Sequence, residues 1–90
     1  MAYWTVKDDN SNISIVQTLF NDVCIDVGRI EKPYNSEEIY LVTGWNHETL
    51  SNNGSYVFRS YEDAERRIIE HYENEMEVTK QWEIQSELNA

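Results

Sequence analysis

The chain contains one cysteine, one proline, three glycines and seven basic residues among 90, and it has no long hydrophobic run. One cysteine excludes an internal disulfide framework. No apolar stretch reaches the roughly 18 residues of a membrane span. Seven basic against 17 acidic residues give a net charge of −10, the opposite sign from that of a nucleic-acid-binding domain. We therefore expect neither direct binding to nucleic acid nor a membrane segment.

The residues that are present predict one ordered domain over residues 1–90. Hydrophobic residues make up 40% of the chain and aromatic residues 12%, which is enough to form a core. A chain of this length has an expected radius of gyration of about 12 Å. The first residues lack the basic and apolar regions of a secretory signal, and Cys24 between Val23 and Ile25 is typical of an inert strand thiol. These features predict a cytoplasmic location.

The spacing of apolar residues predicts an α+β fold, in which a three- to four-stranded antiparallel sheet packs against a C-terminal amphipathic helix. Strands are expected at residues 3–6, 23–29, 39–45 and 56–59. The last three follow one another through short connections, which favours an antiparallel meander. Residues 13–20 fit either a short helix ending at Asn21 or a strand, and we favour the helix.

The C-terminal helix is the best-defined element of the sequence. Ser60 is a good N-cap residue, and the helix is expected from Tyr61 to about Glu77. Residues 78–84 fit either a final edge strand or a continuation of the helix, and residues 86–90 are expected to be a loose tail. The apolar stripe of the helix is formed by Tyr61, Ala64, Ile68, Tyr72 and Met76.

Acidic residues are concentrated on this helix, since residues 62–90 include nine acids and three bases. In its first half, the four-residue spacing predicts ion pairs of Glu62 with Arg66 and of Asp63 with Arg67. The second half lacks such pairs, apart from Arg66 and Arg67 near Glu70. It is expected to lie near the helix C-terminus, where the helix dipole disfavours carboxylates by a few tenths of a kcal/mol each. The residues concerned are Glu70, Glu73, Glu75 and Glu77.

Carboxylates repeated at roughly 5–6 Å along a helix present a regular line of negative charge, as the phosphates of a duplex do. This pattern predicts a protein partner with a basic nucleic-acid-binding groove. Tyr34, next to Pro33, is the aromatic residue best placed to anchor such a partner. The alternative is that the acidic helix face is ordinary solvated surface. Four further acids could extend the partner-binding surface: Asp8, Asp9, Glu37 and Glu38.

Motifs for catalysis and for cofactor binding are missing from the chain. His47 and His71 are the only histidines, and with one cysteine they do not form a zinc site of standard spacing. The three glycines are scattered, so there is no glycine-rich phosphate loop. We therefore expect no enzymatic activity, no cofactor and no metal.

In composition and predicted element order the chain resembles small acidic inhibitors of phages and mobile elements, including anti-CRISPR proteins, anti-restriction proteins and uracil-DNA glycosylase inhibitors. The ending Ser86-Glu87-Leu88-Asn89 resembles the tail of one anti-CRISPR protein. The resemblance implies a stoichiometric inhibitor without a cofactor, which acts in the host cytoplasm on a nucleic-acid-binding defence protein such as a Cas nuclease. The alternative is an interaction module without nucleic-acid mimicry, which binds through aromatics such as Trp45 or through strand edges, as an edge-strand homodimer does.

Overall fold

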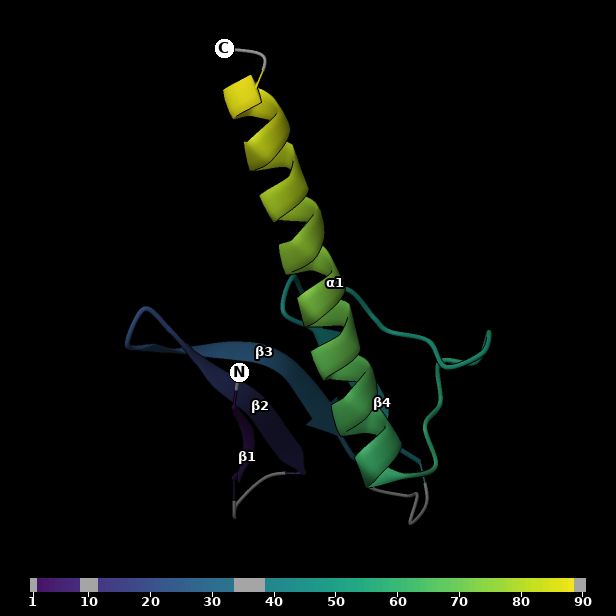
Figure 1. Ribbon diagram of the computed structural model, residues 1–90. Coiled ribbons are helices and arrows are strands. Elements are labelled where there is room, and N and C mark those ends of the chain that lie inside the picture. The colour runs from purple at the N-terminus through teal and green to yellow at the C-terminus, as the bar shows by residue number, and fades with distance from the viewer. Residues whose placement is uncertain (1, 9–11, 34–38, 89–90) are drawn as a thin grey trace.

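The computed structural model describes residues 2–8, 12–33 and 39–88, with side chains through Glu77. The chain forms a four-stranded antiparallel sheet followed by one helix, which confirms the predicted α+β fold (Figure 1). The elements are β1 (Tyr3–Lys7), β2 (Ile13–Phe20), β3 (Val23–Glu31), β4 (Leu41–Gly44) and α1 (Tyr61–Leu88).

The strands form a meander in the order β1-β2-β3-β4. Asn21 and Asp22 join β2 to β3, and both have positive φ angles, 51° and 63°. Two such residues suit the tight turns that match the twist of paired strands. A bulge opposite Val16 and Gln17 inserts one extra residue into β3. The predicted strands at 3–6 and 23–29 are confirmed with slightly longer bounds, and that at 39–45 is shortened to β4.

The helix favoured for residues 13–20 is wrong, because this segment is the strand β2. It pairs with β1 on one side and with β3 on the other. Ser14, Val16 and Thr18 are buried beneath the helix, and the residues between them point to the opposite face of the sheet. Because apolar residues lie on both faces, the alternation typical of a strand is hidden in the sequence.

The strand predicted at residues 56–59 is also wrong. Within this segment only Phe58 forms a β-bridge, with Tyr40. Phe58 is 1% exposed whereas Tyr56 is 60% exposed, although a regular strand would place both on one face. The segment from Glu48 to Phe58 instead runs along β4 as a loop, and its backbone hydrogen-bonds to Val42, Gly44 and Tyr40.

Helix α1 begins at Tyr61 as predicted, and the Ser60 hydroxyl accepts the Asp63 N–H at 3.3 Å. The helix continues to Leu88, well beyond the predicted end at Glu77. Residues 78–84 are thus helical, and the loose tail predicted at 86–90 is wrong as far as Leu88. The absence of glycine and proline over this stretch permits the extension. Residues 89 and 90 lie outside the described residues.

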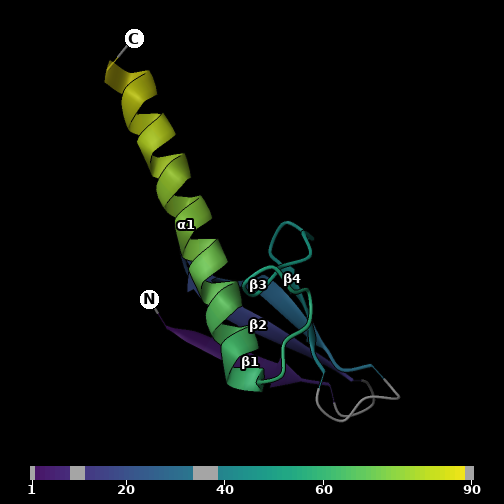
Figure 2. The ribbon, with the colours of Figure 1, turned by 90° about the vertical axis from the view of Figure 1, so that its right-hand side faces the viewer.

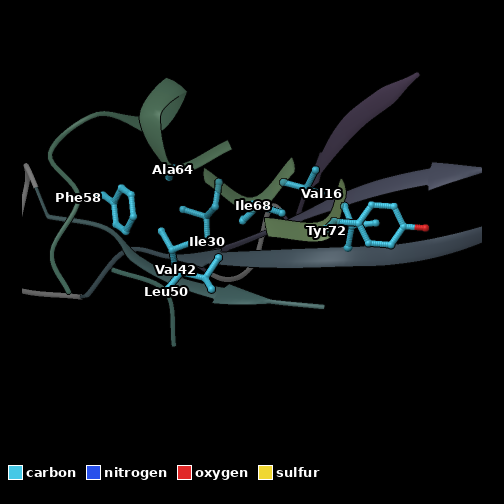
Figure 3. Packing of buried hydrophobic residues seen from close by; sticks show 9 residues of the cluster. Val16, Ile30, Val42, Leu50, Phe58, Ala64, Ile68 and Tyr72 are labelled. Carbon is cyan, nitrogen blue, oxygen red and sulfur yellow. The ribbon is translucent and has the colours of Figure 1, made fainter. Parts of the chain in front are cut away.

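One face of the sheet packs against the apolar stripe of α1, as predicted (Figure 3). Ala64, Ile68 and Tyr72 are buried, and Tyr61 and Met76 pack against them at the margin. Gly28 of β3 lies directly under Ile68, where a Cβ atom would come within 2.4 Å of Ile68 Cγ2. The buried hydrophobic residues of the sheet and loops are Val16, Val27, Ile30, Val42, Leu50 and Phe58.

The first half of α1 packs over the sheet, and its C-terminal half extends beyond the sheet in both ribbon views (Figures 1 and 2). The radius of gyration is therefore 15.1 Å, with extents of 54 × 32 × 18 Å, and the value of about 12 Å expected for a compact domain is too small.

Candidate protein-binding surfaces

The acidic ridge, defined here as Glu70, Glu73 and Glu77, lies on α1 outside the apolar stripe, with Glu73 at the side next to β1. All three residues are exposed. At about 100° per residue their side chains fall within roughly 60° of one another around the helix axis. The three residues span about 10.5 Å along the helix axis, which corresponds to one carboxylate per roughly 5 Å. A DNA strand carries one phosphate per about 3.4 Å of its axis. The linear charge densities are of the same order.

Glu73 is held in place by the first strand of the sheet. Its Oε1 atom accepts a hydrogen bond from the Tyr3 hydroxyl at 2.9 Å. Burial raises the pKa of Tyr3 to about 12, with further contributions from the hydrogen bond to Glu73 and from its charge. Glu65, two turns earlier, accepts a hydrogen bond from the Thr5 hydroxyl at 2.7 Å. Two helix carboxylates thus bind β1, a role that the helical spacing alone does not reveal.

Replacing Tyr3 with phenylalanine tests this contact. Because the pKa of Tyr3 rises from 10.0 to about 12 on folding, its neutral form stabilises the fold fully below pH 10. That contribution is lost between pH 10 and about 12, because in this range the Tyr3 hydroxyl has lost its proton in the unfolded chain but still holds it in the folded chain. We expect Tyr3→Phe to lower the free energy of unfolding by up to about 1 kcal/mol at neutral pH. The difference should shrink across the alkaline range.

Urea unfolding at a series of pH values measures this effect. Tyr56→Phe is the matched control, since Tyr56 is 60% exposed and its replacement should change the free energy of unfolding by less than about 0.5 kcal/mol. A Tyr3→Phe deficit that stays constant through pH 12 would contradict the assigned contact.

The other residues predicted to bind a partner do not join the ridge. Glu75 is half-buried, and the helical rotation places it roughly 140° from Glu70. Asp8 is exposed and follows the end of β1 that lies away from Glu73, because Tyr3 contacts Glu73 and Thr5 contacts Glu65. The remaining predicted residues lie outside the described residues: Asp9, Tyr34, Glu37 and Glu38.

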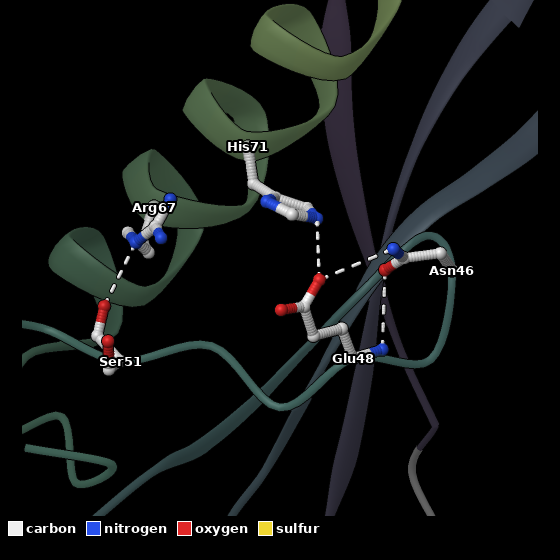
Figure 4. Close-up of polar contacts among 5 residues, drawn as sticks. All are labelled: Asn46, Glu48, Ser51, Arg67 and His71. Carbon is white, nitrogen blue, oxygen red and sulfur yellow. Dashed lines mark hydrogen bonds and ion pairs between the residues drawn. The ribbon is translucent and has the colours of Figure 1, made fainter.

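The basic residues in the first half of α1 lie one turn before Glu70 and line one hollow with it, but their polar contacts are with other residues. Arg66 forms an ion pair with Asp63 at 3.3 Å, rather than the predicted pair with Glu62. Arg67 donates to the backbone carbonyl of Ser51 at 2.9 Å, so its predicted pairing with Asp63 is wrong (Figure 4). Because α1 ends at Leu88, the ridge is not in the last turn, and the predicted conflict with the helix dipole does not arise there. The repulsion between Glu73 and Glu77, four residues apart, remains.

A polar cluster joins α1 to the loop after β4 (Figure 4). His71 Nε2 is buried and lies 3.9 Å from Glu48 Oε2, beyond hydrogen-bond distance. Glu48 also accepts a hydrogen bond from the Asn46 amide at 3.4 Å. The part of the chain with described side chains holds no group of three metal-ligating residues. The cluster connects the helix to the loop.

The sheet face turned away from α1 carries a second surface, of which the sequence analysis named only Trp45 as a possible partner contact. This open face, defined by Trp4, Val6, Leu19, Leu41 and Trp45, exposes large hydrophobic side chains. Alternation along the strands places them on the same face of the sheet. The Trp4 indole donates to Gln17, whose amide donates to Asp26, and these bonds link three strands. A hollow of about 240 Å³ between Asp26, Arg29 and Trp45 indents this face.

Comparison of the chain with protein-family models, with curated proteins and with solved structures gives no match. Although α1 has the length to cross a bilayer, its charged residues recur throughout, and the described residues form no apolar helix that could span a membrane.

Proposed function

We propose that this protein is a non-catalytic inhibitor that occupies the basic groove of a nucleic-acid-binding host-defence protein, such as a Cas nuclease, with carboxylates in place of phosphates. The observation that carries the proposal is the acidic ridge on a helix that extends beyond the sheet (Figure 1). A net charge of −10 would speed association with a basic partner. The proposal needs no cofactor and no catalytic group.

Geometry and charge both support the ridge as the contact surface. Glu70, Glu73 and Glu77 share one helix face, and all three are exposed. The hydrogen bond from Tyr3 restricts the Glu73 side chain, which lowers the entropy lost on binding. Among the described side chains, Arg66 and Arg67 contact Asp63 and Ser51, and neither forms an ion pair with Glu73 or Glu77.

Replacing Glu70, Glu73 and Glu77 together with glutamine tests the proposal. Glutamine keeps the size of each side chain and an acceptor for Tyr3, but it removes the charges. We expect binding to the partner to weaken by roughly 10- to 100-fold. The salt dependence of binding should fall as well. The fold should be unchanged or more stable by a few tenths of a kcal/mol, because the repulsion between Glu73 and Glu77 is relieved.

The measurement uses the immobilised chain and nuclease-treated bacterial lysate, with captured proteins eluted either by salt or by a short DNA duplex. Mimicry requires that duplex DNA displaces the captured protein. The matched control removes three carboxylates from the sheet and its loops, as Asp22→Asn, Glu31→Gln and Glu48→Gln. If the control weakens binding as much as the ridge variant does, net charge and not the ridge is responsible. If neither variant changes binding, the proposal is wrong.

The open face favours a second candidate function, an interaction module that binds through apolar contacts. Trp4 and Trp45 are 37% and 39% exposed on one sheet face, and partially exposed aromatics of this kind are common interface anchors. Binding by this face would persist at high salt and would be lost on Trp45→Ala. In the same capture experiment, salt-resistant binding that tolerates the ridge variant would favour this function over mimicry.

A further inference from the structure

The two edges of the sheet differ in how they are covered. The outer edge of β4 is occupied by the following loop, since Gly44 N–H donates to Glu48 and Leu50 N–H donates to Val42. On the other side, β1 is the last strand. Across the described ranges 2–8, 12–33 and 39–88, no further strand pairs with it. The unpaired edge of a sheet is a template for another strand.

The pairing with β2 shows which groups of β1 point outward. The Asp8 N–H donates to the Ile13 carbonyl at 3.2 Å, which marks a hydrogen-bonded pair. Hydrogen-bonded pairs alternate along an antiparallel ladder, so Val6 and Trp4 also direct their backbone groups toward β2. The backbone groups of Thr5 and Lys7 therefore point away from the sheet.

We propose that a second copy of this chain pairs with β1 in antiparallel orientation, in the register centred on Thr5. This register places Thr5 opposite Thr5 of the second copy and Trp4 opposite its Val6. Trp4 and Val6 are 37% and 49% exposed on the open face. An aromatic residue opposite a β-branched residue stabilises an antiparallel pair, and non-hydrogen-bonded positions bring such side chains closest. Both copies contribute both members of this contact, as two-fold symmetry requires.

Charge complementarity on the helix side favours the same register. Lys7 is exposed and forms no ion pair with the acidic side chains that the structure describes. The proposed register places Lys7 opposite Tyr3 of the second copy, whose hydroxyl is bonded to Glu73. Each Lys7 thus approaches the Glu73 carboxylate of the other copy, and the dimer contains two such contacts. A chain of net charge −10 resists random self-association, so these two contacts make this edge selective.

The dimer would be a continuous eight-stranded sheet with both α1 helices on the same side, because the two-fold axis of an edge-to-edge pair runs perpendicular to the sheet. The inference stands on the strand edge and does not depend on the proposed function.

Sedimentation equilibrium over a wide concentration range tests the dimer. We expect Lys7→Glu to weaken dimerisation by roughly tenfold, because it replaces two attractions with two repulsions. The double variant Lys7→Glu with Glu73→Lys should restore the parent dissociation constant. Arg59→Glu is the control with the same change in charge, since Arg59 is exposed in the loop before α1. A chain that stays monomeric at every concentration overturns the proposal, as does a dimer insensitive to Lys7→Glu.

A cysteine cross-link tests the register separately. Residues in hydrogen-bonded antiparallel pairs have Cα atoms about 5.5 Å apart, within the range of a disulfide. Thr5→Cys in a Cys24→Ser background should therefore give a covalent dimer under mild oxidation. Leu19→Cys in the same background, on an exposed part of β2, should not. Equal cross-linking of both variants would show collisional contact and overturn the register.

Discussion

Replacing Gly28 with alanine is expected to destabilise the protein by about 1–3 kcal/mol, although glycine-to-alanine changes in unstrained backbone usually stabilise. The reason is the close approach of β3 to α1. A Cβ at residue 28 would lie 2.4 Å from Ile68 Cγ2 and 2.8 Å from Ile68 Cγ1. These atoms are next to the helix backbone and fully buried, so the clash requires the helix and the sheet to move apart.

A double-mutant cycle separates this clash from other effects of the substitution. Ile68→Ala alone removes the atoms that the new Cβ would meet and leaves a cavity, at a cost of about 2–5 kcal/mol. In the double variant the alanine methyl at residue 28 has room, so the combined loss should be smaller than the sum of the single losses. Chemical denaturation measures all four free energies. Additive losses would show that Gly28 is required for a reason other than contact with Ile68.

Phe58→Ala is expected to cost about 3–5 kcal/mol, a large fraction of the total stability of a small domain. Phe58 is 1% exposed and packs at the end of the core near Ala64 (Figure 3). Its backbone also exchanges two hydrogen bonds with Tyr40, at 2.7 and 3.0 Å. Loss of the ring would leave a cavity where the loop joins the sheet to α1.

Tyr56→Ala is the matched control for Phe58→Ala. Tyr56 lies two residues earlier in the same loop but is 60% exposed, so its replacement should change the free energy of unfolding by less than about 0.5 kcal/mol. Thermal and urea unfolding of both variants provide the comparison. Similar losses for the two variants would contradict the observed packing of the loop.

The ridge could be predicted in part from the sequence, since the helical period alone places Glu70, Glu73 and Glu77 on one face. The same helical period places Glu75 on a different side of the helix from these three residues. Glu75 was included in the predicted partner-binding surface because of its charge and not because of its position. The contact of Glu73 with Tyr3 joins residues 70 positions apart, and no local pattern reports it. Of the open face, only Trp45 was named from the sequence, because the other hydrophobic residues come from several strands whose pairing the sequence does not state.

Several features of the protein could be predicted from local spacing and composition alone. These are the negative charge, the start of α1 at its Ser60 cap, the apolar stripe, and the strand at Val23–Glu31. Tertiary structure decided that residues 13–20 form a strand, since β1 and β3 supply backbone partners on both sides. It also decided that Phe58 is buried and Tyr56 is not. The physical reason is that periodicity reports which residues avoid water, whereas the partners that cover them come from distant parts of the chain.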